Sequence, residues 1–198
     1  MNYLAHLYLS ADHPKLSIGN FIADHVKGRE IERYSGDILE GIRLHRHIDA
    51  FTDAHPVVEE SKKRLRTVYG KYASVIADVY FDHFLARDWA MYHHQSLSDF
   101  ARSSYSLMNT NRHHLPERTV YMLSYMESQN WLLSYASIDG IEKAFRGLSK
   151  RTRFDSGMEH AHQFLREYDQ EFEGEFRRFF PELQETCKGF KSAVRSEK

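Results

Sequence analysis

The amino-acid sequence predicts an all-α protein, a single-domain helical bundle spanning residues 1–198. Helix start and stop signals recur along the chain, whereas no Asn-Gly or Asp-Gly turn separates two runs of alternating hydrophobic residues. The chain has only four prolines among its 198 residues, so few positions force a helix to end. Its composition, 41% hydrophobic and 14% aromatic, is sufficient to bury a core. We expect roughly seven to nine helices.

The first clear helix is predicted after Asp37, which forms a capping-box pattern with Glu40 three residues later. His55 ends this helix, because a residue that precedes proline is driven out of the α conformation. Pro56 is suited to the first position of the next helix, since its missing N–H has no partner there. That second helix is expected to stop at Gly70.

The later part of the chain continues the helical pattern. Residues 71–92 carry hydrophobic side chains on most sides of a helix, which predicts a position in the centre of the protein. Ser96 with Asp99, and then Pro116, are start signals for two more helices. Residues 157–180 combine acidic and aromatic residues at helical spacing, and we expect one long helix there.

Charge and cysteine content exclude several classes of protein. Lys and Arg total 27 and Asp and Glu total 28, so the net charge of −1 predicts no bulk attraction to nucleic acid or to an anionic membrane. A single cysteine, Cys187, excludes an intramolecular disulfide and a cysteine-rich zinc site. No stretch approaches the ~20 apolar residues that cross a bilayer, and no signal-peptide pattern is visible. We therefore expect a cytoplasmic protein with no nucleic-acid or membrane partner.

Three segments place polar ligand-type side chains four residues apart, within otherwise apolar runs. They are Asn20 with Asp24, His45 with Asp49 and Asp53, and Asp78 with Asp82. Residues four apart lie one above the other on the same face of a helix. Each segment therefore presents a row of oxygen and nitrogen donors.

These carboxylates cannot converge in a helical core as bare anions, because unpaired buried charge is costly. Either they face solvent, or a divalent cation neutralises them. A set of His and carboxylate ligands without Cys suits Mn²⁺, Mg²⁺, Fe²⁺ or Zn²⁺. Such a cation lowers the pKa of a bound water and polarises a phosphoryl oxygen. A single His-x-x-x-Asp pair is usually a surface ion pair, so it is the coincidence of three segments that favours a metal site.

Four blocks of the first 90 residues form a specific combination: Asn2–Leu9, Gly19–Gly28, Gly41–Pro56 and Asp78–Trp89. Together they resemble the acyl carrier protein phosphodiesterase family, also called acyl carrier protein hydrolase. The resemblance implies an all-α fold distantly like the HD-type metal phosphohydrolases and dependence on Mn²⁺ or a similar divalent ion. The implied reaction is hydrolysis of the phosphodiester that joins 4'-phosphopantetheine to a serine of holo-acyl carrier protein.

The resemblance places the family's essential aspartate at Asp24, within the Gly-Asn-x-x-x-Asp block. The His-Asp dipeptide of HD enzymes is absent, and the spaced pair His45/Asp49 and the reversed dipeptide Asp82-His83 stand in its place. The resulting hypothesis takes six residues as metal ligands or their orienting groups, with Mn²⁺ as the first choice of metal. These six are His6, Asp24, His45, Asp49, Asp78 and Asp82.

Three further residues are candidates for catalytic roles beside Asp24. Arg46 and His83 are candidates for stabilising the charge that develops on the phosphoryl and leaving oxygens. Asp53 is a candidate for an orienting group or a base. Each has a structural alternative: a surface position for Arg46, a hydrogen-bonded core position for His83, and a helix cap for Asp53.

An acidic carrier protein as partner requires a basic docking surface. Residues 61–71 contain five positive charges and no acidic residue, although a solubilising helix face would look the same. The predicted docking residues are Arg43, Lys62, Lys63, Arg64 and Arg66, and Lys150, Arg151 and Arg153 are candidates to extend this surface. Two other functions remain open: an HD-like metal phosphohydrolase acting on nucleotides or another small phosphodiester, and a non-enzymatic helical binding module. The sequence does not predict the oligomeric state.

Overall fold

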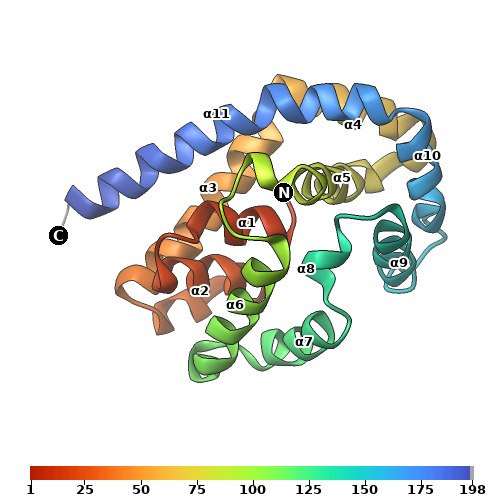
Figure 1. The fold of residues 1–198 in the computed structure, drawn as a ribbon. Helices are drawn as coiled ribbons and strands as arrows, with labels where there is room; N and C mark the ends of the chain where they lie inside the picture. The colour runs from red at the N-terminus through yellow and green to blue at the C-terminus, as the bar shows by residue number, and fades with distance from the viewer. Residues whose placement is uncertain (197–198) are drawn as a thin grey trace.

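Helices account for all the regular secondary structure in residues 1–196, the part of the chain that the computed structural model describes (Figure 1). The α-helices are α1 (Tyr3–Ser10), α2 (Pro14–Ile22), α3 (Gly36–Ala54), α4 (Pro56–Tyr69), α5 (Ala73–Arg87), α6 (Leu97–Thr110), α7 (Glu117–Ser128), α8 (Trp131–Ser134), α9 (Ile138–Ser149), α10 (Ala161–Glu167) and α11 (Asp169–Ser196). Short 3₁₀ turns join several of them, including η1 (Ala23–His25). The all-α prediction is confirmed. Within the described range no helix is both long and apolar enough to span a membrane.

Helix α5 lies at the centre of the core, as its apolar pattern predicts, because it is buried on nearly every side. The long helix α11 crosses it and supplies a row of aromatic rings (Figure 1). Phe176 packs on Phe81 and Phe84, with ring centroids 5.8 and 5.9 Å away. Phe172 meets Tyr80 edge to face at 4.9 Å. Burial of these large rings supplies much of the hydrophobic stabilisation.

Helices α2 and α3 cross in direct backbone contact at two glycines. A Cβ atom on Gly19 would overlap the carbonyl oxygen of Ile38, and one on Gly41 would overlap that of Leu16. Any residue other than glycine would therefore force the two helices apart. This close crossing brings the side chains that follow Gly19 on α2 within hydrogen-bonding reach of α3.

Several predicted boundaries are confirmed and others move. Pro56 begins α4, and Ser96 caps α6 by accepting the backbone N–H of Asp99 at 3.1 Å. Helix α3 begins at Gly36 with Ser35 as its N-cap, two residues before the start predicted after Asp37. The single long helix expected over 157–180 is wrong: the chain leaves the α conformation at Tyr168, which separates α10 from α11. Local periodicity does not reveal such a break, because both pieces continue the same pattern.

Candidate functional site

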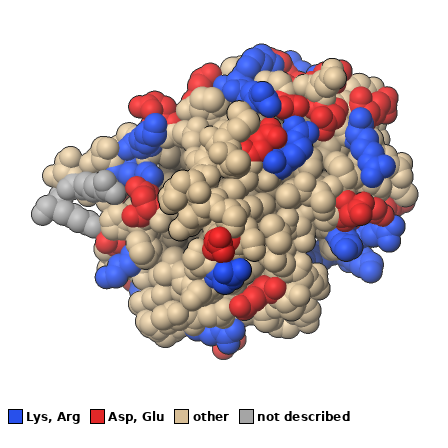
Figure 2. All heavy atoms as spheres, viewed as in Figure 1, with Lys and Arg blue, Asp and Glu red and all other residues tan. Residues whose placement is uncertain are grey.

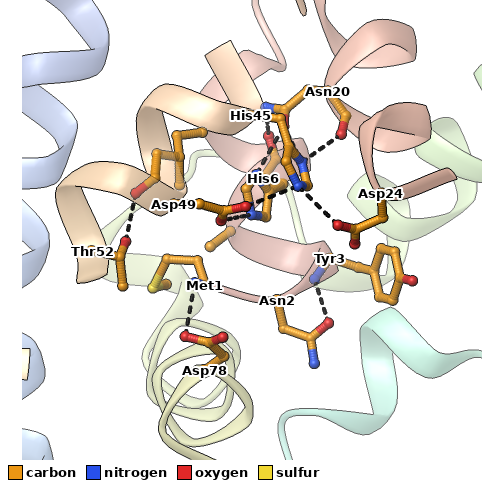
Figure 3. Close-up of polar contacts among 12 residues, drawn as sticks. Met1, Asn2, Tyr3, His6, Asn20, Asp24, His45, Asp49, Thr52 and Asp78 are labelled. Atoms are coloured by element: carbon orange, nitrogen blue, oxygen red, sulfur yellow. Dashed lines mark hydrogen bonds and ion pairs between the residues drawn. The ribbon is translucent and has the colours of Figure 1, made fainter. Parts of the chain in front are cut away.

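Helices α1 and α3 and the 3₁₀ turn η1 bring two histidines and two aspartates together (Figure 3). The nearest nitrogen and oxygen atoms of His6, His45 and Asp49 all lie within 4.8 Å of one another. Asp49 is central: Nε2 of His6 is 3.2 Å from one carboxylate oxygen, and Nε2 of His45 is 3.1 Å from the other. Asp24, in η1, places its carboxylate 3.3 Å from the same Nε2 of His45. The i, i+4 spacing of His45 and Asp49 supplies one part of the cluster, and the fold supplies the rest.

Asn20 determines which nitrogen of each imidazole faces the aspartates. Its side-chain amide donates to the carbonyl oxygen of His6 at 2.8 Å, so its other side-chain atom, the oxygen, must be the acceptor beside the rings. Nδ1 of His6 donates to that oxygen at 2.8 Å, and Nδ1 of His45 donates to the backbone carbonyl of Asn20 at 2.9 Å. Both Nδ1 atoms are therefore protonated, and both Nε2 atoms point at carboxylate oxygens.

The electrostatics of the cluster favour a positive charge between these atoms. Burial alone would lower the pKa of His45, but hydrogen bonds to Asp24 and Asp49 outweigh it and raise that pKa to about 9. The His6 ring stacks on the His45 ring with centroids 4.0 Å apart, and burial together with the charge of His45 lowers the pKa of His6. For Asp49, burial opposes ionisation, yet its hydrogen bonds to both histidines hold its pKa well below the usual value. The His45 hydrogen bond likewise lowers the pKa of Asp24.

The donor set fits a divalent cation. With each Nδ1 used as a donor, the lone pair of each Nε2 would face a carboxylate lone pair unless a proton or a metal ion lay between them. Two imidazole nitrogens and carboxylate oxygens form a mixed set that suits Mn²⁺, Fe²⁺ or Zn²⁺. The hydrogen bonds that orient the rings are of the kind that surrounds metal-binding histidines.

A cavity of about 560 Å³ opens directly onto this cluster. Asp24, His45 and Asp49 lie in one wall, together with Asp53 and Asp78. The side chain of Asp24 is 58% exposed and that of Asp49 is 43% exposed, so a ligand can reach them from the cavity. Residues of α8 and α9 also line the cavity.

The structure places Asp82 outside the cluster, although the sequence-based hypothesis grouped it with the metal ligands. Asp82 is fully buried, and its carboxylate accepts backbone N–H groups of Asn2, Leu4 and Ala5 at 3.2, 2.7 and 3.3 Å. It therefore caps the amino end of α1. Asp78, one turn earlier on α5, lines the cavity. Its carboxylate accepts a hydrogen bond of 2.9 Å from the amino group of Met1.

The three remaining catalytic candidates lie in different surroundings. Arg46 is exposed on α3 and does not line the cavity. His83 is buried, and its Nδ1 lies 2.7 Å from the carbonyl oxygen of Tyr135, the hydrogen-bonded core position that was its structural alternative. Asp53 lines the cavity and forms an ion pair of 2.6 Å with Lys62.

Most cations of the predicted docking surface have acidic partners within the protein. Lys62 is only 4% exposed and pairs with Asp53. The other pairs are Arg43 with Glu40, Arg64 with Glu175 and Arg66 with Glu59. Figure 2 shows the same mixing of basic and acidic side chains along the edge where α4 and α11 lie. Lys63 is exposed, and no ion pair involves it within the described part of the chain.

Sequence reasoning missed most of the cavity wall that α8 and α9 supply, although it named Arg151 as a candidate extension of the docking surface. Lys143, Gly147 and Arg151 line it, as does Trp131. The only sign of this wall in the sequence is a set of residues spaced three and four apart, beginning at Gly140, which helical geometry places on one face. It carried no chemistry by itself, because small residues at helical spacing are also typical of ordinary helix packing.

Comparison with known proteins gives one consistent result. The family model described as acyl carrier protein phosphodiesterase matches residues 1–183. Curated proteins with that same name align over nearly the whole chain. The protein from Photorhabdus laumondii is 31% identical over 186 residues, which is 93% of this chain and 94% of that protein. The protein from Enterobacter sp. (strain 638) is 34% identical over 190 residues, 95% and 98% of the two chains.

A third relative, from Yersinia pestis, is 31% identical over 184 residues, 92% of this chain and 95% of its own. No solved structure shows significant similarity to the chain. The likeness to HD-type phosphohydrolases therefore stays a prediction, as does the cytoplasmic location.

Proposed function

The chain belongs to the acyl carrier protein phosphodiesterase family, and on that premise we propose that it is a metal-dependent enzyme acting on holo-acyl carrier protein. The reaction is hydrolysis of the phosphodiester between 4'-phosphopantetheine and the carrier-protein serine, which leaves the apo form. A single domain, residues 1–198, carries the activity. The observation that supports metal dependence is the convergence of His6, His45 and Asp49 beside an open cavity that His45 and Asp49 line.

We assign the metal-binding role to His6, His45, Asp49 and Asp24. A bound divalent cation, Mn²⁺ first and Mg²⁺, Fe²⁺ or Zn²⁺ as alternatives, supplies Lewis acidity toward a phosphoryl oxygen and lowers the pKa of a water molecule. The two imidazoles present Nε2 because Asn20 occupies both Nδ1 positions. The exposed carboxylates of Asp24 and Asp49 leave room for substrate beside them.

Other residues at the cavity have supporting roles. Asp53 and Asp78 face the same space and are placed to accept hydrogen bonds from water or substrate. The ion pair with Lys62 limits where the Asp53 side chain points, which suits an orienting group. We assign no role on phosphate to Arg46 or His83, because neither lines the cavity.

The decisive experiment compares Asp49→Ala with the wild type on purified holo-carrier protein and Mn²⁺. Mass spectrometry would follow loss of the prosthetic group, and thermal melting with and without Mn²⁺ would report metal binding independently of activity. We expect Asp49→Ala and Asp24→Ala to lose release of the prosthetic group, and Asp49→Ala to lose the Mn²⁺-dependent rise in melting temperature. Glu185→Ala, an exposed acid on α11, is the matched control. Full activity in both cluster variants would refute the assignment.

Docking of an acidic protein needs positive charge near the cavity. Because four of the five predicted docking cations are already paired, we propose that Lys63 makes the main contribution from α4. An ion pair inside the protein leaves little unbalanced charge for a partner, whereas an exposed lysine attracts one over about a Debye length.

A further inference from the structure

The cavity wall opposite the metal-binding cluster is built from one face of α9 and its continuation. The lining residues there are Gly140, Lys143, Ala144, Gly147, Leu148 and Arg151. Their spacing of three, one, three, one and three residues keeps them on one side of a helix. Helix α9 packs on α5 and α8, so this face is held in place (Figure 1).

The two glycines on this face have different explanations. A Cβ atom on Gly140 would overlap the carbonyl oxygen of Ser134, so Gly140 is required for α8 to pack against α9. A Cβ atom on Gly147 would meet no atom within 4 Å. A glycine inside a helix lowers its stability, and here no packing contact compensates. The space above Gly147 belongs to the cavity, which is where a ligand would lie.

Two cations stand on the same wall without an acidic partner. Lys143 and Arg151 are both exposed at the cavity, and among the described residues neither takes part in an ion pair. The Arg151 guanidinium lies 5.7 Å from the centre of the Trp131 ring, a cation–π contact that orients it and leaves its N–H groups free to donate. The carboxylates of Asp24, Asp49 and Asp78 line the same cavity.

Charged residues from both walls of the cavity act on the hydroxyl group of Tyr3. Burial and the charge of Asp24 raise the pKa of the Tyr3 hydroxyl to about 12, and the charge of Arg151 opposes them. Tyr3 also lines the cavity, so Arg151 and Asp24 act across the same space. An anion placed there would lie between the metal-binding cluster and a cationic wall.

We propose that the α8–α9 wall is the binding subsite for the 4'-phosphopantetheine arm. Lys143 and Arg151 contact the non-bridging phosphoryl oxygens, and the open space over Gly147, flanked by Ala144 and Leu148, holds the branched, amide-containing chain. The ligand has an anionic phosphate head next to a narrow, partly apolar chain. The wall offers two cations for the phosphate and small side chains beside which the chain fits. This inference rests on the proposed function, because that function supplies the ligand.

The test is direct binding of free 4'-phosphopantetheine to the Mn²⁺-treated protein, measured by calorimetry and by tryptophan fluorescence. The sequence has two tryptophans, and Trp89 is 4% exposed in the core, so Trp131 is the reporter at the cavity. We expect a saturable fluorescence change that disappears in Trp131→Phe. In Gly147→Leu we expect binding to weaken by about tenfold or more, because the side chain fills the space for the chain.

Gly174→Leu is the matched control. Gly174 also lies inside a helix, α11, where a Cβ atom would meet nothing within 4 Å, but it is outside the cavity. Leucine is a better helix former than glycine at both positions, so both variants should fold. Pantetheine, which lacks the phosphate, separates the two parts of the subsite: Lys143→Ala with Arg151→Ala should weaken binding of 4'-phosphopantetheine and leave binding of pantetheine unchanged.

The outcomes separate this inference from the proposed function. If Gly147→Leu binds 4'-phosphopantetheine as well as the wild type does, while the wild type still releases the arm from holo-carrier protein, the subsite is wrong and the function stands. If binding is lost in Gly147→Leu but the wild type releases nothing from holo-carrier protein, the subsite stands and the proposed reaction is wrong.

Discussion

The side-chain oxygen of Asn20 lies 2.8 Å from Nδ1 of His6, and this contact determines how the histidine faces Asp49. Asn20 is fully buried, and its side-chain nitrogen also donates to the backbone carbonyl of His6. The orientation of the amide is therefore fixed through both its nitrogen and its oxygen. The residue binds no metal itself in this arrangement. It holds two imidazoles in the tautomer that a metal site needs, and this explains why an asparagine lies one turn before Asp24.

Replacing Asn20 by alanine should weaken Mn²⁺ binding about 10- to 100-fold, because the His6 imidazole loses the side-chain oxygen that orients it, while His45 keeps only the backbone carbonyl of residue 20. Calorimetric titration of Mn²⁺ into the metal-free protein measures this directly. Ser17→Ala is the control, since Ser17 is also buried on α2 and donates to the Ser10 carbonyl at 2.8 Å, away from the cluster. Equal Mn²⁺ affinity in the two variants would contradict the orienting role.

Gly41→Ala should destabilise the protein by about 3 kcal/mol or more, because the new methyl group overlaps the backbone of α2. The helices would have to separate, and the contact between Asn20 and His45 would be lost with them. Urea unfolding gives the free energy of unfolding. Gly174→Ala should instead raise that free energy by up to about 1 kcal/mol, since its Cβ meets open space and alanine favours the helix. Similar behaviour of the two variants would refute the close-contact argument.

Arg64→Ala should cost about 2–4 kcal/mol in the free energy of unfolding, because it leaves the carboxylate of Glu175 buried without its charged partner. Glu175 is 3% exposed and receives two hydrogen bonds from Arg64, at 2.7 and 3.0 Å. Arg66→Ala removes the same charge from the same helix, but its partner Glu59 is solvent-exposed, so a much smaller change is expected. Equal losses in the two variants would show that burial of Glu175 does not matter.

Asp82 should make stability fall as pH rises through the neutral range. Burial raises its pKa from 3.8 to about 7, more than its hydrogen bonds to backbone amides lower it. Between these values the folded state binds a proton that the unfolded state has released, so increasing pH favours unfolding. This contribution is fully present below pH 3.8 and is lost as the pH passes about 7.

Asp82→Asn isolates that effect, because asparagine does not titrate. The difference in unfolding free energy between wild type and variant, measured with a chelator present, should shift in favour of the variant by the order of 2 kcal/mol from pH 5 to pH 8. The other titrating groups cancel in this difference. A constant difference, or a shift in favour of the wild type, would show that the Asp82 carboxyl is ionised throughout.

Lys63→Glu should raise KM for holo-carrier protein several-fold at low salt, with little effect near 1 M salt, because the docking charge is solvent-exposed and screened. Steady-state kinetics at several salt concentrations provide the measurement. Lys15→Glu is the comparison, since Lys15 on α2 is an equally exposed lysine outside α4. If the two variants behave alike, Lys63 has no specific docking role.

Much of the fold could be predicted from the sequence because its determinants are local. Ser96 with Asp99 marks a helix start by a hydrogen bond between near neighbours, and Pro56 marks another through the geometry of its own ring. The apolar character of α5 on most of its sides predicts its place in the core without reference to any neighbouring helix. The row of His45 and Asp49 follows from the helical repeat alone.

Only the tertiary structure determines which helix packs against each row of polar side chains. Asp24 and Asp82 have the same four-residue pattern in the sequence, yet one lies at the open cluster and the other caps α1. The sequence groups Arg64 with a basic patch, but its acidic partner Glu175 lies 111 residues later in the chain. Helical spacing determines which side chains share a face of one helix, but the element that covers that face is chosen by packing between segments far apart in the chain.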